Sequence, residues 1–265
     1  MKLNDKLSWN RMRPLLIAGP CVVENAELCF QVASHMQQLC QQIGWDYVFK
    51  ASYKKANRTS LHSFTGLGTD ESLRILDDLR QQLSVPVITD VHETTDLPSV
   101  SQAVDLLQVP AFLCRQTELL IACGQTGKPV NIKKGQFMAP NQMQFAVDKV
   151  KSTGNDQVLL TERGTFFGYS DLVVDMRSIP LMQSFAPVIF DVTHSVQQPG
   201  GLGERSGGNR LMAPVLARAA AAVGVDGFFI ETHPSPDQAL SDGPNMIPLK
   251  EMKKMLIKLS SILSC

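Results

Sequence analysis

Residues 187–191 read PVIFD, a short apolar run that ends in an acid. Seven similar runs stand elsewhere in the chain, and together the eight decide the fold. The runs are Leu15–Gly19 (LLIAG), Asp46–Lys50 (DYVFK), Pro86–Asp90 (PVITD), Asp105–Val109 (DLLQV), Pro129–Lys133 (PVNIK), Gln157–Thr161 (QVLLT), Pro187–Asp191 (PVIFD) and Gly227–Glu231 (GFFIE). Most are continuously apolar, as expected of strands that are buried on both faces.

The runs begin 31, 40, 19, 24, 28, 30 and 40 residues apart, about the length of one strand and one helix. Helices are predicted at Ala26–Ile43, Asp70–Leu83, Leu97–Val104, Glu118–Thr126, Asn141–Ser152, Leu211–Val223 and Leu249–Leu263. Eight alternations predict an α/β fold, a single (β/α)8 barrel over residues 1–265. The alternative is a doubly wound open sheet, which a Gly-x-Gly-x-x-Gly turn after an early strand would favour, and no such turn follows one.

The composition excludes several classes of protein. The 25 Lys and Arg residues balance the 25 Asp and Glu residues, which argues against a nucleic-acid-binding module. No stretch approaches the ~18 apolar residues of a membrane span. The six cysteines include no Cys-x-x-Cys pair and are too sparse for a disulfide scaffold, which predicts a reducing, cytoplasmic location.

Reactive and ionic residues follow almost every predicted strand. In chain order they are Cys21; Lys50, Lys54, Lys55 and Arg58; Asp90 and His92; Arg115; Lys133 and Lys134; Glu162 and Arg163; His194; and Glu231 and Asp242. The active site of a barrel enzyme lies at this end of the strands. A neutral protein with basic residues gathered at one face is suited to hold anions.

Residues 50–60, KASYKKANRTS, carry four positive charges and no acid. Guanidinium and hydroxyl groups together suit a phosphate, although a solvated basic loop would have the same composition. Lys133 and Arg163 directly follow buried runs, where an unpartnered charge is costly. They are therefore expected either to bind an anion or to pair with Asp90 or Glu162.

Four possible metal ligands follow the first, seventh and eighth strands, which are neighbours in a closed barrel. They are Cys21, His194, Glu231 and Asp242. A thiolate, an imidazole and two carboxylates suit Zn²⁺ or Fe²⁺, and Mn²⁺ can bind through the carboxylates. Taken singly, each residue also has an ordinary structural explanation, such as a core cysteine or an ion-paired glutamate.

His92 and His233 are reserve ligands, whereas His62 falls in a loop where no catalytic role is expected. Residues 197–210, QQPGGLGERSGGNR, hold five glycines and cannot pack a core. This stretch is interpreted as a mobile lid over the site, with an inert surface loop as the alternative.

Nine segments spread over nearly the whole chain share motifs with a known family. They are AGPCVVE at 18–24, FKASYKKANRTS at 49–60, TDVHE at 89–93, PAFLCRQT at 110–117, NIKKGQF at 131–137, TERGTFFGY at 161–169, FDVTHSVQQPGG at 190–201, FIETHP at 229–234 and SDGP at 241–244. Together they resemble the 3-deoxy-D-manno-octulosonate 8-phosphate synthases. The resemblance implies condensation of phosphoenolpyruvate with D-arabinose 5-phosphate and water in lipopolysaccharide biosynthesis, by a homotetramer.

The resemblance also implies residue roles. Phosphoenolpyruvate would be bound by Lys55, Lys133 and Arg163, and the sugar phosphate by Asn57, Arg58 and Ser60. Two further residues, Lys50 and Arg115, would contact substrates, Arg115 from its own or a neighbouring subunit. The residues that would serve catalysis are Lys55, Lys133, Asp90 and His194. One branch of the family needs a divalent metal, and the metal-free branch carries Asn at the position of Cys21. All four possible ligands match the metal branch. Lys54 departs from a common acidic residue and Thr59 from a common Ser.

Three other functions compete with this one. The first is a 3-deoxy-D-arabino-heptulosonate 7-phosphate synthase, which uses a four-carbon aldose phosphate and against which the KANRTS segment argues. The second is a Schiff-base aldolase with Lys133 or Lys50 as its nucleophile. The third is a non-catalytic sugar-phosphate sensor, which would have no use for a metal.

Overall fold

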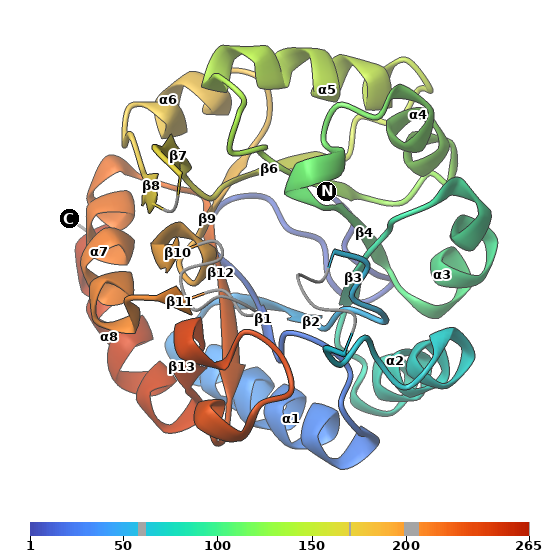
Figure 1. Cartoon of the computed structure of the whole chain (residues 1–265), viewed down its shortest axis with the longest axis horizontal. Coiled ribbons are helices and arrows are strands. Elements are labelled where there is room, and N and C mark those ends of the chain that lie inside the picture. Colours follow the sequence, from blue (N-terminus) through green and yellow to red (C-terminus); the bar gives the residue numbers. More distant parts are fainter. Residues whose placement is uncertain (58–61, 170, 199–206, 265) are drawn as a thin grey trace.

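The structure is a computed structural model that describes residues 1–57, 62–169, 171–198 and 207–264. Within these residues, parallel strands follow one another around a closed barrel that helices surround (Figure 1). The strands are β1 (Leu15–Gly19), β2 (Asp46–Lys50), β3 (Val87–Asp90), β4 (Leu106–Val109), β5 (Val130–Lys133), β6 (Val158–Glu162), β9 (Val188–Asp191) and β12 (Gly227–His233). Strand β12 pairs with β1 and closes the barrel. The predicted (β/α)8 barrel is confirmed, and the open sheet is excluded.

The helices form the outer ring seen in Figure 1. They are α1 (Ala26–Ile43), α2 (Thr69–Leu83), α3 (Leu97–Ala103), α4 (Thr117–Gln125), α5 (Met143–Lys151), α6 (Ser178–Gln183), α7 (Ala213–Val223) and α8 (Met252–Leu263). Helix α1 begins where the Asn25 side chain accepts a hydrogen bond from the Leu28 N–H, and it ends at Gly44 in the left-handed region. In the described part of the chain, no helix is long and apolar enough to cross a membrane.

The region between β6 and β9 differs from the prediction. It contains the unpredicted helix α6 and the hairpin of β7 (Thr165–Phe167) and β8 (Asp171–Val173). Helix α6 has six residues, SIPLMQ, too few to show a helical period, and the hairpin strands are largely exposed. Strand β12 also runs two residues beyond its predicted end, because Thr232 and His233 pair with β13 (Ile247–Pro248).

The barrel interior has an apolar layer at the amino ends of the strands. Its members are Leu15, Ile17, Val48, Ile88, Leu106, Leu159, Ile189 and Phe229, with Leu3 and Trp9 packed against them. Residues 1–9 thus close this end of the barrel, and the Trp9 indole N–H donates to the Arg13 carbonyl at 2.8 Å. A second, larger apolar cluster lies between the strands and the helices.

Two residues further along the strands, the inward side chains are polar or charged. They include Lys50, Asp90, Gln108, Thr161, Asp191 and Glu231, all of them buried. Because side chains alternate across a strand, a step of two residues keeps the same inward direction. The interior therefore changes from apolar to polar between the amino and carboxyl ends of the same strands.

Candidate active site

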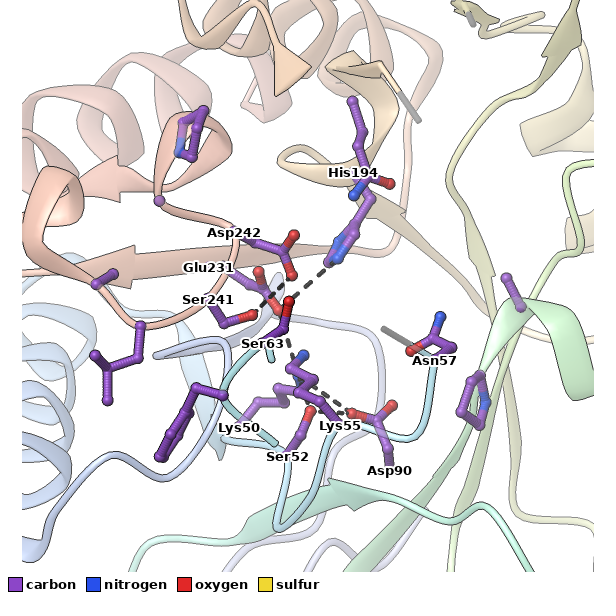
Figure 2. Close-up of a pocket in the computed structure, with 18 of the residues that line it drawn as sticks. Lys50, Ser52, Lys55, Asn57, Ser63, Asp90, His194, Glu231, Ser241 and Asp242 are labelled. Atoms are coloured by element: carbon purple, nitrogen blue, oxygen red, sulfur yellow. Dashed lines mark hydrogen bonds and ion pairs between the residues drawn. The ribbon is translucent and has the colours of Figure 1, made fainter. Parts of the chain in front are cut away.

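A cavity of about 790 Å³ lies at the carboxyl ends of the strands. Its wall includes the cations Lys50, Lys55, Lys133 and Arg163, the carboxylates Asp90, Glu231 and Asp242, and the imidazoles of His92 and His194. Figure 2 shows Glu231, Ser241 and Asp242 together, with Lys50, Lys55, Ser52 and Asp90 below them and Asn57 to one side. The predicted convergence of these strand ends is present in the structure.

Lys50 ends β2 and joins carboxylates from two other strands (Figure 2). Its Nζ lies 3.3 Å from Asp90 Oδ2 and 3.4 Å from Glu231 Oε1, and it donates to Ser52 Oγ at 2.9 Å. Strands β1 and β2 approach each other closely here: a Cβ on Gly19 would stand 2.0 Å from the Lys50 carbonyl oxygen. A residue with a side chain would not fit, so glycine at this position allows the ends of the two strands to lie together.

Asp90 is buried and remains ionised. Burial alone would raise the pKa of its carboxyl group, but the ammonium groups of Lys50, Lys55 and Lys133 hold that pKa well below its usual value. The Ser52 hydroxyl donates to Asp90 Oδ2, and the Gln108 amide donates to Asp90 Oδ1. These two donors were not predicted from the sequence.

Lys133 ends β5 and pairs with Asp191 across the barrel. Its Nζ lies 2.8 Å from Asp191 Oδ2 and 3.7 Å from the centroid of the Phe229 ring. Burial lowers the pKa of Lys133, and Asp191 opposes that effect. The alternative prediction that Lys133 forms an ion pair with Asp90 or Glu162 was wrong, because its ion pair is with Asp191. Asp191 could have been found, because it ends the run PVIFD as Asp90 ends PVITD.

Arg163 follows β6 and is buried beside the cavity. One terminal nitrogen donates to Gln197 Oε1 at 3.0 Å, whereas Nη1 has no hydrogen-bond partner among the described residues. The alternative of an ion pair with Asp90 or Glu162 is therefore not supported: Glu162 Oε1 lies 3.5 Å from Lys134 Nζ. A buried donor of this kind normally has a partner, so its position indicates a site for an anion.

Two other side chains that line the cavity also have a buried polar atom without a hydrogen-bond partner in the described part of the chain. The atoms are His92 Nδ1 and Gln136 Oε1. Burial lowers the pKa of His92. The cavity therefore presents unused donors and acceptors as well as charge, which is the pattern of a binding site for a polar ligand.

Three of the four predicted metal ligands lie together. Ligand atoms of Cys21, Glu231 and Asp242 all lie within 4.8 Å of one another, and Cys21 Sγ lies 3.0 Å from Asp242 Oδ2. His194 Nε2 lies 3.8 Å from Glu231 Oε1 (Figure 2). Asp242 has a φ of +48°, a left-handed conformation that costs free energy in a residue with a side chain.

The electrostatics of this group suit a divalent cation. Burial raises the pKa of the Cys21 thiol, and the carboxylates of Asp242 and Glu231 raise it further. A bound cation would reverse this effect and stabilise the thiolate. Asp191 lies 2.8 Å from His194 Nδ1, and because a carboxylate only accepts, that nitrogen carries the proton. Nε2 faces Glu231 and is the nitrogen that would bind a metal, as in metal-binding histidines whose other ring nitrogen donates to a carboxylate. These residues fit a divalent metal.

Comparison with known proteins identifies the family. The sequence model of the DAHP synthetase I family matches residues 6–264. The chain belongs to this family. Three similar relatives are each named 2-dehydro-3-deoxyphosphooctonate aldolase. They come from Thioalkalivibrio sulfidiphilus (54% identity, 93% of this chain and 89% of the relative), Dechloromonas aromatica (54%, 93% and 90%) and Syntrophobacter fumaroxidans (52%, 98% and 90%).

Some predicted residues stand outside the cavity of this DAHP synthetase I family member. Arg115 is exposed and is not among the described residues that line the cavity, so its contact with substrates stays a prediction. His233 instead accepts a hydrogen bond from the Ser235 N–H at 2.9 Å. His62, of which no role was expected, lines the cavity. The predictions for Arg58, Thr59, Ser60 and most of the glycine-rich lid fall on residues 58–61 and 199–206, outside the described part of the chain.

Lys54, which departs from the acidic residue common in the resembling enzymes, has a local partner. Its Nζ lies 2.7 Å from Asp96 Oδ2, and the Tyr53 hydroxyl donates to the same oxygen at 2.5 Å. The positive charge of Lys54 is therefore offset by Asp96.

Proposed function

We propose that the chain condenses phosphoenolpyruvate with D-arabinose 5-phosphate and water, giving 3-deoxy-D-manno-octulosonate 8-phosphate and inorganic phosphate. The observation that carries this proposal is the set of cations Lys50, Lys133 and Arg163 at the ends of β2, β5 and β6, in a chain whose relatives are named 2-dehydro-3-deoxyphosphooctonate aldolase. The product would serve lipopolysaccharide biosynthesis in the cytoplasm.

Phosphoenolpyruvate would bind against Lys55, Lys133 and Arg163. Nη1 of Arg163 has no hydrogen-bond partner among the residues that the structure describes, and this supports the assignment, because a carboxylate or phosphate oxygen would satisfy it. Both substrates are anions, so fixed cations would hold them side by side against their mutual repulsion. The sugar phosphate would extend toward Asn57, which lines the cavity, and toward Arg58 and Ser60 beyond it.

The reaction forms one carbon–carbon bond and breaks one bond to phosphate. The methylene carbon of phosphoenolpyruvate attacks the aldehyde, water adds at the adjacent carbon, and the resulting hemiketal phosphate collapses to release inorganic phosphate. Asp191 would hold His194 and Lys133 in place beside the reacting atoms through its bonds to both side chains. Lys50 and Asp90 would fix the opposite side of the cavity.

The proposal includes a divalent metal, Zn²⁺, Fe²⁺ or Mn²⁺, with Cys21, His194, Glu231 and Asp242 as its ligands. The donor set and the short distances within it support this assignment. When bound, such an ion supplies Lewis-acid chemistry, by activating water or orienting the aldehyde oxygen. These four side chains lie at or beyond the carboxyl ends of β1, β9 and β12.

The proposal also includes a homotetramer, in which Arg115 would reach the substrates of its own or a neighbouring subunit. Exposed aromatic side chains on the β7–β8 hairpin, Phe166, Phe167 and Tyr169, support an interface near the site.

The test is release of inorganic phosphate from phosphoenolpyruvate by the purified chain. We expect release with arabinose 5-phosphate and far less with erythrose 4-phosphate, the four-carbon aldose phosphate. Faster turnover of erythrose 4-phosphate would favour the heptulosonate synthase, and inactivation by borohydride in the presence of substrate would favour the Schiff-base aldolase. No phosphate release with either aldose, together with no inactivation by borohydride, would leave only the sensor.

A further inference from the structure

A row of side-chain hydrogen bonds crosses four strands below the cavity. Thr161 Oγ1 on β6 donates to Asn131 Oδ1 on β5 at 2.8 Å, and Asn131 Nδ2 donates to Gln108 Oε1 on β4 at 2.9 Å. Gln108 Nε2 then donates to Asp90 Oδ1 on β3 at 2.6 Å. We call Thr161, Asn131 and Gln108 the relay. All three are fully buried, and none lines the cavity in the described part of the chain.

Every hydrogen bond of the relay points toward Asp90. An ionised carboxylate only accepts, so Gln108 must present its amide N–H to Asp90 and its oxygen to Asn131. Asn131 must then present its own N–H to Gln108, which leaves its oxygen for the Thr161 hydroxyl. Hydrogen bonds aligned in this way polarise one another and strengthen the last bond to the charged group. The orientation of the whole row therefore matches a negative charge on Asp90.

We propose that Thr161, Asn131 and Gln108 are positioning residues that keep Asp90 ionised and oriented in the active site. With Oδ1 held by Gln108, the other oxygen of Asp90 is directed at Ser52 and Lys50, which do line the cavity. The relay would thus act on the substrates only through Asp90. This inference rests on the proposed function, since it assigns the relay a part in that reaction.

Other charged or titratable side chains also face Asp90, but unlike the relay they line the cavity. They are Lys50 from β2, Lys55 from the loop after it, Lys133 from β5, and His92 two residues beyond Asp90. All four line the cavity, where anionic substrates would compete with Asp90 for them. Gln108, the relay residue that donates to Asp90, does not line the cavity in the described part of the chain, so bound substrates would not compete for it. We therefore expect the relay to hold Asp90 in the same way with and without bound substrates.

Two substitutions at Thr161 and a matched control test the relay. Thr161→Val removes the terminal hydroxyl at nearly constant volume, and Thr161→Ser restores it. Thr89→Val is the control, because Thr89 is equally buried and, within the described part of the chain, its hydroxyl bonds only backbone groups: it donates to the Ala51 carbonyl and accepts from the Tyr53 N–H. Gln108→Leu removes the donor to Asp90 directly. The steady-state kcat and the KM of each substrate would be measured for each full-length variant.

Loss of a hydrogen bond to Asp90 should impair the reaction through Asp90 rather than the binding of substrates, so kcat should fall while both KM values stay close to wild type. We expect Gln108→Leu to lower kcat about tenfold, the scale of a lost hydrogen bond to a charged group. Thr161→Val should lower kcat by a smaller factor. Thr161→Ser should restore the wild-type kcat, and Thr89→Val should leave kcat unchanged.

The relay would be refuted if the kcat of Thr161→Val matched that of Thr89→Val, or if Thr161→Ser lowered kcat as far as Thr161→Val. The Thr161 variants decide the matter even if Gln108→Leu fails to fold. Wild-type protein without turnover would instead refute the proposed function, so the two failures are distinguishable.

Discussion

The two ends of the barrel interior are built on the same strands but have opposite chemistry. At the amino end, side chains such as Ile88, Leu159 and Ile189 form an apolar layer that Trp9 helps to close. Two residues further along these strands lie Asp90, Thr161 and Asp191. A step of two residues thus separates the apolar layer of the barrel interior from the polar layer to which we assign the chemistry.

The carboxyl end is costly to bury, and its partners show how that cost is limited. Lys133 is compensated by Asp191 and by the face of the Phe229 ring. Arg163 is not fully compensated, because its Nη1 has no partner in the described chain. A bound anion would supply the missing partner. We therefore expect this Nη1 group to lower the stability of the free protein and to strengthen the binding of an anion.

Removal of the metal should have the largest effect on the carboxyl end. Without a cation, the carboxylates of Glu231 and Asp242 would repel one another and the buried Cys21 would be a neutral thiol, so a chelator should abolish phosphate release, and Zn²⁺, Fe²⁺ or Mn²⁺ should restore it to differing degrees. Metal content would be measured on the same samples. Full activity of wild-type protein with negligible metal would show that Cys21 is only a packing residue.

Two substitutions separate the ligands. Cys21→Asn removes one anion and introduces the residue of the metal-free branch, so it should lose metal affinity but keep weak, chelator-insensitive turnover. His194→Ala should have little activity with or without added metal, because His194 is also placed beside the reacting atoms. Equal behaviour of the two variants would contradict the separate roles.

Removal of a cavity cation should weaken recognition of phosphoenolpyruvate. Arg163→Ala and Lys133→Ala should each cost about 1.5–3 kcal/mol in kcat/KM for phosphoenolpyruvate, the scale of a lost charge-assisted hydrogen bond. Steady-state kinetics would measure the loss. Wild-type kcat/KM in either variant would remove that residue from the site.

The same pair should differ in stability. Lys133→Ala leaves the buried Asp191 carboxylate without its ammonium partner, which should lower the free energy of unfolding. Arg163→Ala removes a guanidinium that is only partly hydrogen-bonded and should cost less stability. Urea unfolding of both variants would compare them.

Arg58→Ala should have a more selective effect. The residue lies outside the described part of the chain, and its assignment to the sugar phosphate rests on the KANRTS motif. The KM for arabinose 5-phosphate should rise far more than the KM for phosphoenolpyruvate. Equal losses for both substrates would withdraw the assignment.

Substitution at the amino end should have the smallest effect on catalysis. Leu159→Ala should lower the free energy of unfolding by roughly 2–5 kcal/mol, as expected of a truncated core leucine, and leave kcat/KM for phosphoenolpyruvate nearly unchanged. Urea unfolding and kinetics on the folded protein would measure both. A kinetic loss as large as that of Arg163→Ala would break the division between the two ends.

The sequence predicted the strands and the ionic residues at their ends because both signals are local. A buried run followed by an ionic residue is visible at Lys133 and at Asp90 without knowledge of the fold. The partners of these residues depend on the strand order and register of the folded sheet: Gln108 lies opposite Asp90 on the neighbouring strand β4, and Asp191 on β9 reaches Lys133 past β6. Helix α6 was missed because six residues are too few to show a helical period.

Diffraction from crystals soaked with phosphoenolpyruvate would show whether the carboxyl end of the barrel binds this substrate. We expect electron density in the cavity, with ligand oxygens within hydrogen-bonding distance of Lys133 Nζ and Arg163 Nη1. Phosphoenolpyruvate bound elsewhere on the protein, with both of these side chains left as they are in the free chain, would show that this end is not its binding site.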